Sequence, residues 1–211
     1  MEMKNLSKII NGAFSFGMIQ NYNEIHGAVE FILKENISNF LEIGTNQGGT
    51  FYAWTCASNP GVRISIDIPH GPFGTRNYNE NARNNVLSGY PGECLFISGS
   101  SHDKGNRSLA KKFLNKRKLD FLFIDGDHTE LGVTKDLMLY KELVRHNGWI
   151  GFHDIKPTEY HHSNNCFVDV LWSKLEGNKV EFVDNSSQFG GIGFIQYNED
   201  IKHNGKSIYE Q

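Results

Sequence analysis

Hydrophobic residues follow two alternating patterns along the chain. Short apolar or β-branched runs, most of them closed by glycine or an acid, predict strands. These runs lie at 39–44, 62–68, 93–100, 119–125, 148–154, 179–185 and 190–197. Between them, apolar residues recur every three or four positions, which is the period of an amphipathic helix. Helices are predicted at 24–35, 48–58, 106–117 and 166–177, with one more after Thr129 and one after the turn-rich segment 69–85.

Strands that alternate with helices predict an α/β fold with a mostly parallel sheet covered on both faces. The last two strands follow each other through the short segment 186–190, so we expect an antiparallel hairpin at the sheet edge. Asn106 is the expected N-cap of the helix at 106–117. Residues 1–22 lack clear periodicity and are interpreted as an N-terminal arm, either flexible or used as a homo-oligomer contact. A single domain then occupies 23–211.

The composition is that of a globular protein, with 38% hydrophobic and 21% charged residues in 211. A net charge of −3 gives no electrostatic reason to expect a nucleic-acid or membrane partner. Cys56, Cys94 and Cys166 are scattered and favour neither a disulfide scaffold nor a thiolate metal site. The sequence shows no signal-peptide pattern and no apolar run of the roughly 20 residues that span a bilayer, so we expect a cytoplasmic protein.

Polar residues and glycines gather where the predicted strands end. In an open doubly wound sheet, ligands bind at the carboxyl ends of the strands, near the point where the strand order reverses. The segments at these ends are 42–49, 99–101, 125–128 and 153–154, together with Asp67. We therefore expect all of them to surround one crevice.

The first strand ends in the sequence EIGTNQGG, which contains Gly44, Gly48 and Gly49. Gly44 permits a tight turn into the helix, and the later pair lets a ligand approach the backbone. The pattern is not G-x-G-x-x-G, and Glu42 would repel a pyrophosphate but attract an ammonium or sulfonium group. Asp67, at the end of the second strand, is either a ribose ligand or a surface acid. Together, the two acids favour a nucleoside that carries a positive charge.

This first motif resembles that of class I S-adenosylmethionine-dependent methyltransferases, and the similarity extends over about residues 25–197. The resemblance implies a three-layer, Rossmann-like sheet of seven strands, mostly parallel with an antiparallel last strand. It also implies S-adenosyl-L-methionine as the cofactor. By the same likeness, the residues expected around the cofactor are Glu42, Gly44, Thr45, Gly48 and Gly49 at the methionine part, Asp67 at the ribose, Ser100 and Ser101 at the adenine, and Asp125 alongside.

A second resemblance rests on FIDGDH at 123–128 and GFHD at 151–154. These motifs are similar to those of metal-assisted O-methyltransferases, in particular the small bacterial enzymes grouped with cephalosporin hydroxylase-like and rhamnosyl or macrolide-sugar O-methyltransferases. The resemblance implies that Asp125 and Asp154 bind a divalent metal such as Mg²⁺, which would neutralise their mutual repulsion. His153 stands where the family often has an acid or amide. As a third ligand it suits Mn²⁺, Fe²⁺ or Zn²⁺ better than Mg²⁺.

Neighbouring side chains have two interpretations each. Asp127 is a further metal ligand or a cap for the helix that follows. His128 is the general base, which we favour, or it orients the aspartate three residues earlier. His161 and His162 bind substrate or metal, or they belong to a solvated loop. The loop at 69–77 closes over the cofactor or is an ordinary connection.

These interpretations predict a divalent-metal-assisted O-methyltransferase that uses S-adenosylmethionine, with Asp125 and His128 as catalytic residues. Its acceptor would be a hydroxyl of a sugar or of another small diol or catechol-like molecule. The alternatives are a metal-dependent hydrolase or hydroxylase, a nucleotide-binding dehydrogenase on a related fold, and a non-catalytic binding protein that has kept the pocket. The missing G-x-G-x-x-G and the acid at Glu42 disfavour the dehydrogenase.

Overall fold

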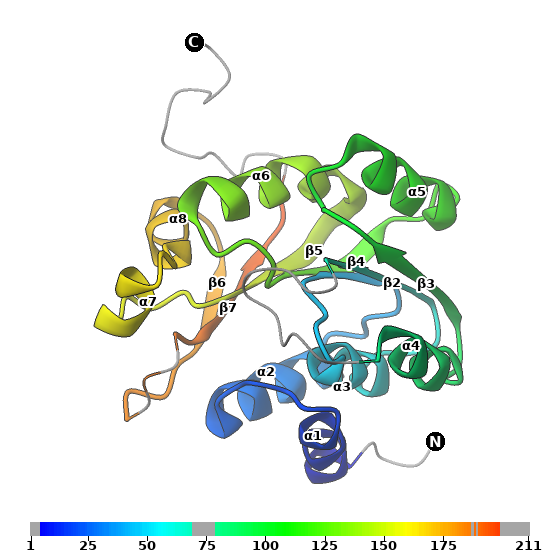
Figure 1. The fold of residues 1–211 in the computed structure, drawn as a ribbon, viewed down its shortest axis with the longest axis horizontal. Helices are drawn as coiled ribbons and strands as arrows, with labels where there is room; N and C mark the ends of the chain where they lie inside the picture. Colours follow the sequence, from blue (N-terminus) through cyan, green and yellow to red (C-terminus); the bar gives the residue numbers. More distant parts are fainter. Residues whose placement is uncertain (1–4, 69–78, 187, 189, 199–211) are drawn as a thin grey trace.

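A computed structural model describes residues 5–68, 79–186, 188 and 190–198. Within these residues, seven strands form one sheet in the order β3-β2-β1-β4-β5-β7-β6 (Figure 1). The strands are β1 Phe40–Ile43, β2 Val62–Asp67, β3 Glu93–Ser98, β4 Leu119–Ile124, β5 Val144–His153, β6 Lys179–Phe182 and β7 Ile192–Gln196. Strand β7 runs in the opposite direction to the other six strands. The predicted seven-stranded α/β fold with a reversed last strand is confirmed.

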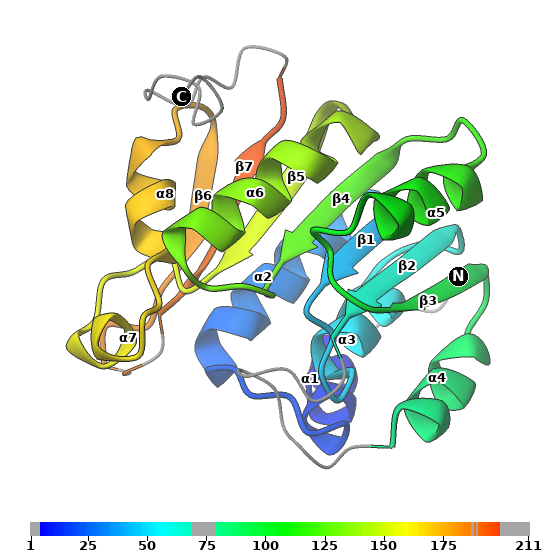
Figure 2. The same cartoon turned by 45° about the horizontal axis from the view of Figure 1, so that its top comes forward.

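Helices cover the two faces of the sheet as separate layers (Figure 2). One layer holds α1 Leu6–Ser15, α2 Tyr22–Lys34, α3 Gly49–Ala57 and α4 Glu80–Ser88. The other holds α5 Lys104–Leu114, α6 Glu130–Tyr140 and α8 Val168–Lys174. The short helices η1 Lys141–Leu143 and α7 Glu159–Ser163 flank β5 in the sequence.

The central strands are buried on both faces, which is why they are apolar along nearly their whole length. In β4, Phe121 and Phe123 join the hydrophobic core under α1, α2 and α3. Leu122 and Ile124 join the opposite core under α5, α6 and α8. Successive side chains of a strand point to opposite faces, so one short run supplies both cores.

The N-terminal residues differ from the expected arm. Asn5 accepts a hydrogen bond from the backbone N–H of Lys8 (3.0 Å) and begins α1. Ile9, Ile10 and Ala13 are buried, and α1 packs against α2 and α3. Hydrophobic burial therefore makes this segment part of the core rather than a flexible extension.

Two local expectations on the other face need correction. The N-cap of α5 is Asp103, not Asn106, because the Asp103 carboxylate accepts from the backbone N–H of Gly105. Asn106 instead donates to the backbone carbonyl of Ser100 (3.0 Å) and braces the end of β3. The polar stretch after β5, predicted as a loop, contains the short helix α7, capped by Thr158.

The strand order reverses between β1 and β4. The chain runs outward from β1 through β2 to β3, and then returns to the other side of β1 as β4 and β5. The backbone N–H of Asp125 donates to Ile43 (2.9 Å), and that of Gly44 donates to Ile66 (2.9 Å). The carboxyl ends of β1, β2 and β4 thus lie side by side, where a ligand site is expected.

Candidate functional site

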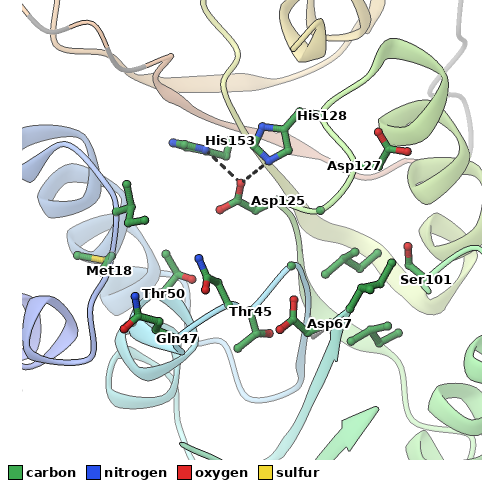
Figure 3. Close-up of a pocket in the computed structure, with 18 of the residues that line it drawn as sticks. Met18, Thr45, Gln47, Thr50, Asp67, Ser101, Asp125, Asp127, His128 and His153 are labelled. Atoms are coloured by element: carbon green, nitrogen blue, oxygen red, sulfur yellow. Dashed lines mark ion pairs between the residues drawn. The ribbon is translucent and has the colours of Figure 1, made fainter. Parts of the chain in front are cut away.

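A cavity of about 330 Å³ opens at this reversal point. Its wall is built from residues 43–47 and 49–50 after β1, 66–68 at the end of β2, 99–102 after β3 and 125–128 after β4. His153 at the end of β5 and residues 17–20 between α1 and α2 complete it. Figure 3 shows these side chains converging from the strand ends. The five predicted strand-end segments therefore do surround one crevice.

The glycine turn after β1 has the backbone that the sequence suggested. Gly44 (φ 88°) and Gly48 (φ 97°) lie in the left-handed region, which side chains with a Cβ rarely adopt. A Cβ on Gly44 would overlap the backbone carbonyl of Asp125. Gly48 is the N-cap position of α3, so the helix begins at the floor of the cavity. A side chain at Gly49 would collide with Met18. Close packing, together with the turn itself, requires glycine at these positions.

Asp67 points into the cavity from the end of β2 (Figure 3). Arg83 of α4 donates to its carboxylate (3.1 Å) and also to the backbone carbonyl of Asn46 in the glycine turn. Arg83 is buried. The cation thus joins the end of β2 to the turn after β1, and it holds the Asp67 carboxylate at the cavity wall.

Ser100 and Ser101 lie on the cavity wall after β3, as expected for the adenine end. The hydroxyl of Tyr140 donates to the backbone carbonyl of Ser101 (2.9 Å) and fixes this segment from α6. Ile68, half exposed, contributes an apolar surface directly after Asp67. This end of the cavity combines backbone polar groups with an apolar face, which suits a heteroaromatic ring.

Glu42 does not line the cavity. Its side chain is fully buried beneath the glycine turn, with the hydroxyl groups of Thr45 and Thr50 beside its carboxyl group. Burial raises the pKa of Glu42 to about 8, and the nearby hydroxyls of Thr50 and Thr45 offset only part of this. In the ligand-free protein at neutral pH, Glu42 is therefore mostly uncharged. The sequence predicted that a negatively charged Glu42 attracts a cation. In the ligand-free protein at neutral pH, Glu42 carries little of that charge.

Asp125 forms the centre of a carboxylate–imidazole group at the other side of the cavity (Figure 3). Its Oδ1 lies 3.2 Å from Nε2 of His128 and 3.1 Å from Nδ1 of His153. Gln20 donates to the second carboxylate oxygen (3.4 Å). The ends of β4 and β5 and the segment before α2 therefore meet at one carboxylate.

Asp154 lies on the far side of the same group. Its Oδ1 is 3.4 Å from Nδ1 of His153 and 3.3 Å from Nε2 of His161, and its Oδ2 is 2.8 Å from Nδ1 of His128. Cys166 donates to Oδ2 as well (3.4 Å). Asp154 has φ 61°, a left-handed conformation that is uncommon for a residue with a side chain and often marks a functional position.

The carboxylates and imidazoles of this group stabilise each other's charged forms. Burial alone would raise the pKa of Asp125, but the charges and hydrogen bonds of His153 and His128 outweigh it and lower that pKa. For His153, burial opposes the charged form, yet Asp154 and Asp125 raise the pKa to about 9. Without a metal, imidazolium groups therefore supply the positive charge between the two carboxylates.

The donor set fits a divalent cation. Nε2 of His153 is buried, and no hydrogen-bond or ion-pair partner is found for it among the described residues. Buried polar atoms without partners are costly, and a cation would satisfy them. Imidazole nitrogen together with carboxylate oxygen is a donor set that first-row transition ions bind well.

Two further predicted residues, Asp127 and His162, lie apart from this group. The Asp127 carboxylate accepts from the backbone N–H (3.0 Å) and the hydroxyl (2.8 Å) of Thr129, and it points toward the start of α6 (Figure 3). Thr129 is itself the N-cap. Of the two interpretations of Asp127, the structure supports the one at the helix start, not a shared ligand position. His162 contacts Asp169 at the surface (3.1 Å). The loop at 69–77, predicted either to close over the cofactor or to be an ordinary connection, lies outside the described residues.

Sequence reasoning missed the segment between α1 and α2. Met18 and Gln20 line the cavity although they precede the first predicted strand. The cap at Asn5 and the spacing of Ile9 and Ala13 could have revealed α1. No local pattern could have shown that Gln20 reaches Asp125, which lies 105 positions later.

The strand order, the reversed last strand and the glycine turn at the reversal point define a class I S-adenosylmethionine-dependent methyltransferase. A family model described as a methyltransferase domain matches residues 41–155, and the chain belongs to this family. No helix among the described residues has the length and apolarity needed to cross a membrane.

Known proteins similar to this chain agree with that class. An uncharacterized protein, R132, of Acanthamoeba polyphaga mimivirus is 26% identical over 170 residues, which cover 74% of each chain. A putative caffeoyl-CoA O-methyltransferase from Staphylococcus aureus has a TM-score of 0.58 at 14% identity, over 92% of each chain. The MycE methyltransferase from the mycinamycin biosynthetic pathway, in complex with Mg, SAH and mycinamycin VI, has a TM-score of 0.58 at 15% identity. That match covers 97% of this chain and 57% of MycE.

Proposed function

We propose that the protein transfers a methyl group from S-adenosylmethionine to a hydroxyl of a small acceptor, assisted by a divalent metal. The observation that carries this proposal is the position of the carboxylate–imidazole group. It lies at the end of β4, in the wall of the same cavity that the glycine turn forms after β1. A cofactor held by the turn would have its reactive carbon next to that group.

In this proposal, each end of the cavity binds one part of the cofactor. The turn with Gly44, Thr45 and Gly49 receives the methionine part, and Asp67 accepts hydrogen bonds from the ribose hydroxyls. The support for this assignment is that all four residues line the cavity and that Arg83 fixes the Asp67 carboxylate. Ser100, Ser101 and the apolar Ile68 would surround the adenine.

The metal would be held by Asp125, His153 and Asp154. When bound, a divalent ion lowers the pKa of an acceptor hydroxyl and orients it toward the methyl group. The chain itself contributes preorganisation. His153 lies 3.1 Å from Asp125 and 3.4 Å from Asp154, so an imidazole already stands beside the carboxylates of two neighbouring strand ends. The two carboxylates would have to move closer together to bind one ion.

His128 has a positioning role in this proposal rather than that of a free base. Its Nε2 faces Asp125 (3.2 Å) and its Nδ1 faces Asp154 (2.8 Å), so both ring nitrogens are engaged by carboxylates. The ring therefore fixes the distance between the two acids. A hydroxyl that is already acidified needs only a weak base, which solvent can supply.

The proposed acceptor is a sugar or another small diol or catechol-like molecule, because two adjacent oxygens can chelate one ion. The relatives support a small-molecule acceptor through their names alone: one is described with caffeoyl-CoA and another is bound to mycinamycin VI. Exposed apolar side chains of Ile19 and Tyr22 beside the cavity segment 17–20 offer contact for a ring system.

Calorimetry with S-adenosylmethionine, followed by mass spectrometry of acceptor mixtures, tests the proposal. We expect micromolar binding and an added methyl group on hydroxyl-bearing acceptors, with turnover lost after chelation and restored by added metal. Asp67→Asn should weaken cofactor binding about tenfold to a hundredfold, because it removes charge-assisted hydrogen bonds. Glu93→Gln is the matched control, since it changes an exposed carboxylate at the opposite end of the sheet. Unchanged affinity in Asp67→Asn would contradict the assigned ribose site.

A further inference from the structure

The segment between β5 and α8 brings a thiol to the back of the carboxylate–imidazole group. Cys166 is buried, and its Sγ lies 3.4 Å from Oδ2 of Asp154 and 3.8 Å from Nδ1 of His128. Those two atoms are 2.8 Å from each other. His128 belongs to the wall of the cofactor cavity, whereas Asp154 and Cys166 do not line it, so the trio extends from that wall into the interior behind it.

We propose that His128, Asp154 and Cys166 form a second metal site, selective for zinc-like ions, that attaches the segment 155–167 to the ends of β4 and β5. The site shares Asp154 with the metal of the proposed function but does not depend on methyl transfer. Within the described residues, these three side chains meet the spacing of a metal-binding group, with one nitrogen, one oxygen and one sulfur donor all within 4.8 Å.

The distances agree with tetrahedral coordination. Zinc binds nitrogen and oxygen at about 2.0 Å and sulfur at about 2.3 Å, which places tetrahedral ligands about 3.3 to 3.6 Å apart. The observed separations of 2.8, 3.4 and 3.8 Å bracket that range. Shifts of a few tenths of an ångström would therefore form the site without moving the backbone.

The backbone holds the ligands in place before any ion arrives. The N–H of Phe167 donates to the carbonyl of His128 (2.8 Å), and the N–H of Cys166 donates to that of His161 (2.9 Å). These bonds fix Cys166 opposite the end of β4. His161 also faces Asp154, with Nε2 at 3.3 Å from Oδ1, the carboxylate oxygen on the other side of Asp154.

The chemistry of the donors selects the ion. A thiolate and an imidazole favour Zn²⁺ or Co²⁺ and disfavour Mg²⁺, which prefers oxygen. On binding, Cys166 releases its thiol proton and His128 releases the proton on Nδ1, both to solvent. The two carboxylate oxygens of Asp154 face different neighbours, so Oδ2 can bind this ion while Oδ1 remains with His153.

Cobalt titration of the full-length protein, after removal of metals by a chelator, tests the site directly. We expect a thiolate-to-cobalt charge-transfer band at one equivalent, and zinc should displace the cobalt. Cys166→Ser should abolish the band and weaken zinc binding at least tenfold. Cys56→Ser and Cys94→Ser are matched controls that should retain both.

X-ray absorption at the zinc edge of the unmodified protein gives a result that does not depend on how the variants fold. One sulfur at about 2.3 Å supports the site, and a shell of nitrogen and oxygen alone overturns it. Methyl transfer with Mg²⁺ but without any charge-transfer band would leave the proposed function standing and refute the second site. A charge-transfer band without methyl transfer would support the second site and contradict the proposed function.

Discussion

Replacing Glu42 by glutamine should change how the stability of the protein depends on pH. In the unfolded chain this carboxyl titrates near 4.5, but burial raises its pKa to about 8 in the folded protein. Below pH 4.5 it is protonated in both states and costs nothing. As the pH rises from there to 8, the unfolded chain releases the proton while the folded protein keeps it. The unfolded state is therefore favoured progressively, and stability is lost.

The size of this effect follows from the two pKa values. Between pH 5 and pH 8, the wild-type protein should lose about 3.5 kcal/mol of unfolding free energy through Glu42. That is a large share of the 5–15 kcal/mol typical of a folded domain. Glu42→Gln has nearly the same shape and carries no charge at any pH. The stability of the variant relative to the wild type should therefore rise by about 3.5 kcal/mol between pH 5 and pH 8.

Urea unfolding of both proteins at pH 5, 6, 7 and 8, followed by tryptophan fluorescence and circular dichroism, measures this difference. The difference between the two proteins isolates Glu42, because the histidine–carboxylate group titrates in both. Glu159→Gln, an exposed position on α7, is the control and should run parallel to the wild type. If the gap between wild type and Glu42→Gln stays constant over this range, Glu42 is not buried as a neutral acid and the reasoning fails.

Two further substitutions test other parts of the site. Gly44→Ala should lower the melting temperature by several degrees and abolish cofactor binding, because a Cβ would overlap the carbonyl of Asp125. The control is Gly89→Ala, where φ is −70° and an added Cβ would have no contact closer than 3.3 Å. It should change neither the melting temperature nor cofactor binding. Asp127→Ala should cost about 1 kcal/mol of stability through the lost bonds to Thr129 while metal affinity stays unchanged. A drop in metal affinity in Asp127→Ala, seen by calorimetry, would restore its interpretation as a ligand.

The sheet was predictable because each strand carries its own signal. β4 is an almost continuous apolar run, and β2 alternates β-branched with polar residues. The reversed last pair follows from the short connection before β7. The end of each strand also carries a polar or glycine residue, so the cavity could be located from the doubly wound rule alone. These features depend on neighbouring residues in the sequence, which is why a single chain reveals them.

What the sequence could not show depends on long-range contacts. Helix α1 buries only a narrow stripe, and the segment after it brings Gln20 to Asp125, far away in the sequence. Glu42 looked like a charge beside the ligand, but burial makes it a mostly neutral group beneath it. Cys166 looked isolated, yet the turn after β5 folds it onto Asp154. Each case was decided by packing that no local pattern encodes.

The account depends most on one arrangement: a sulfonium donor in the glycine turn beside a cation bound by two neighbouring strand ends. A crystal structure with S-adenosylhomocysteine and Mn²⁺, using the anomalous signal of the metal, tests it directly. We predict the ribose hydroxyls on Asp67, the sulfur facing Asp125, and Mn²⁺ bound by Asp125, His153 and Asp154. Cofactor bound outside this cavity, or a metal signal remote from these three residues, would contradict the account.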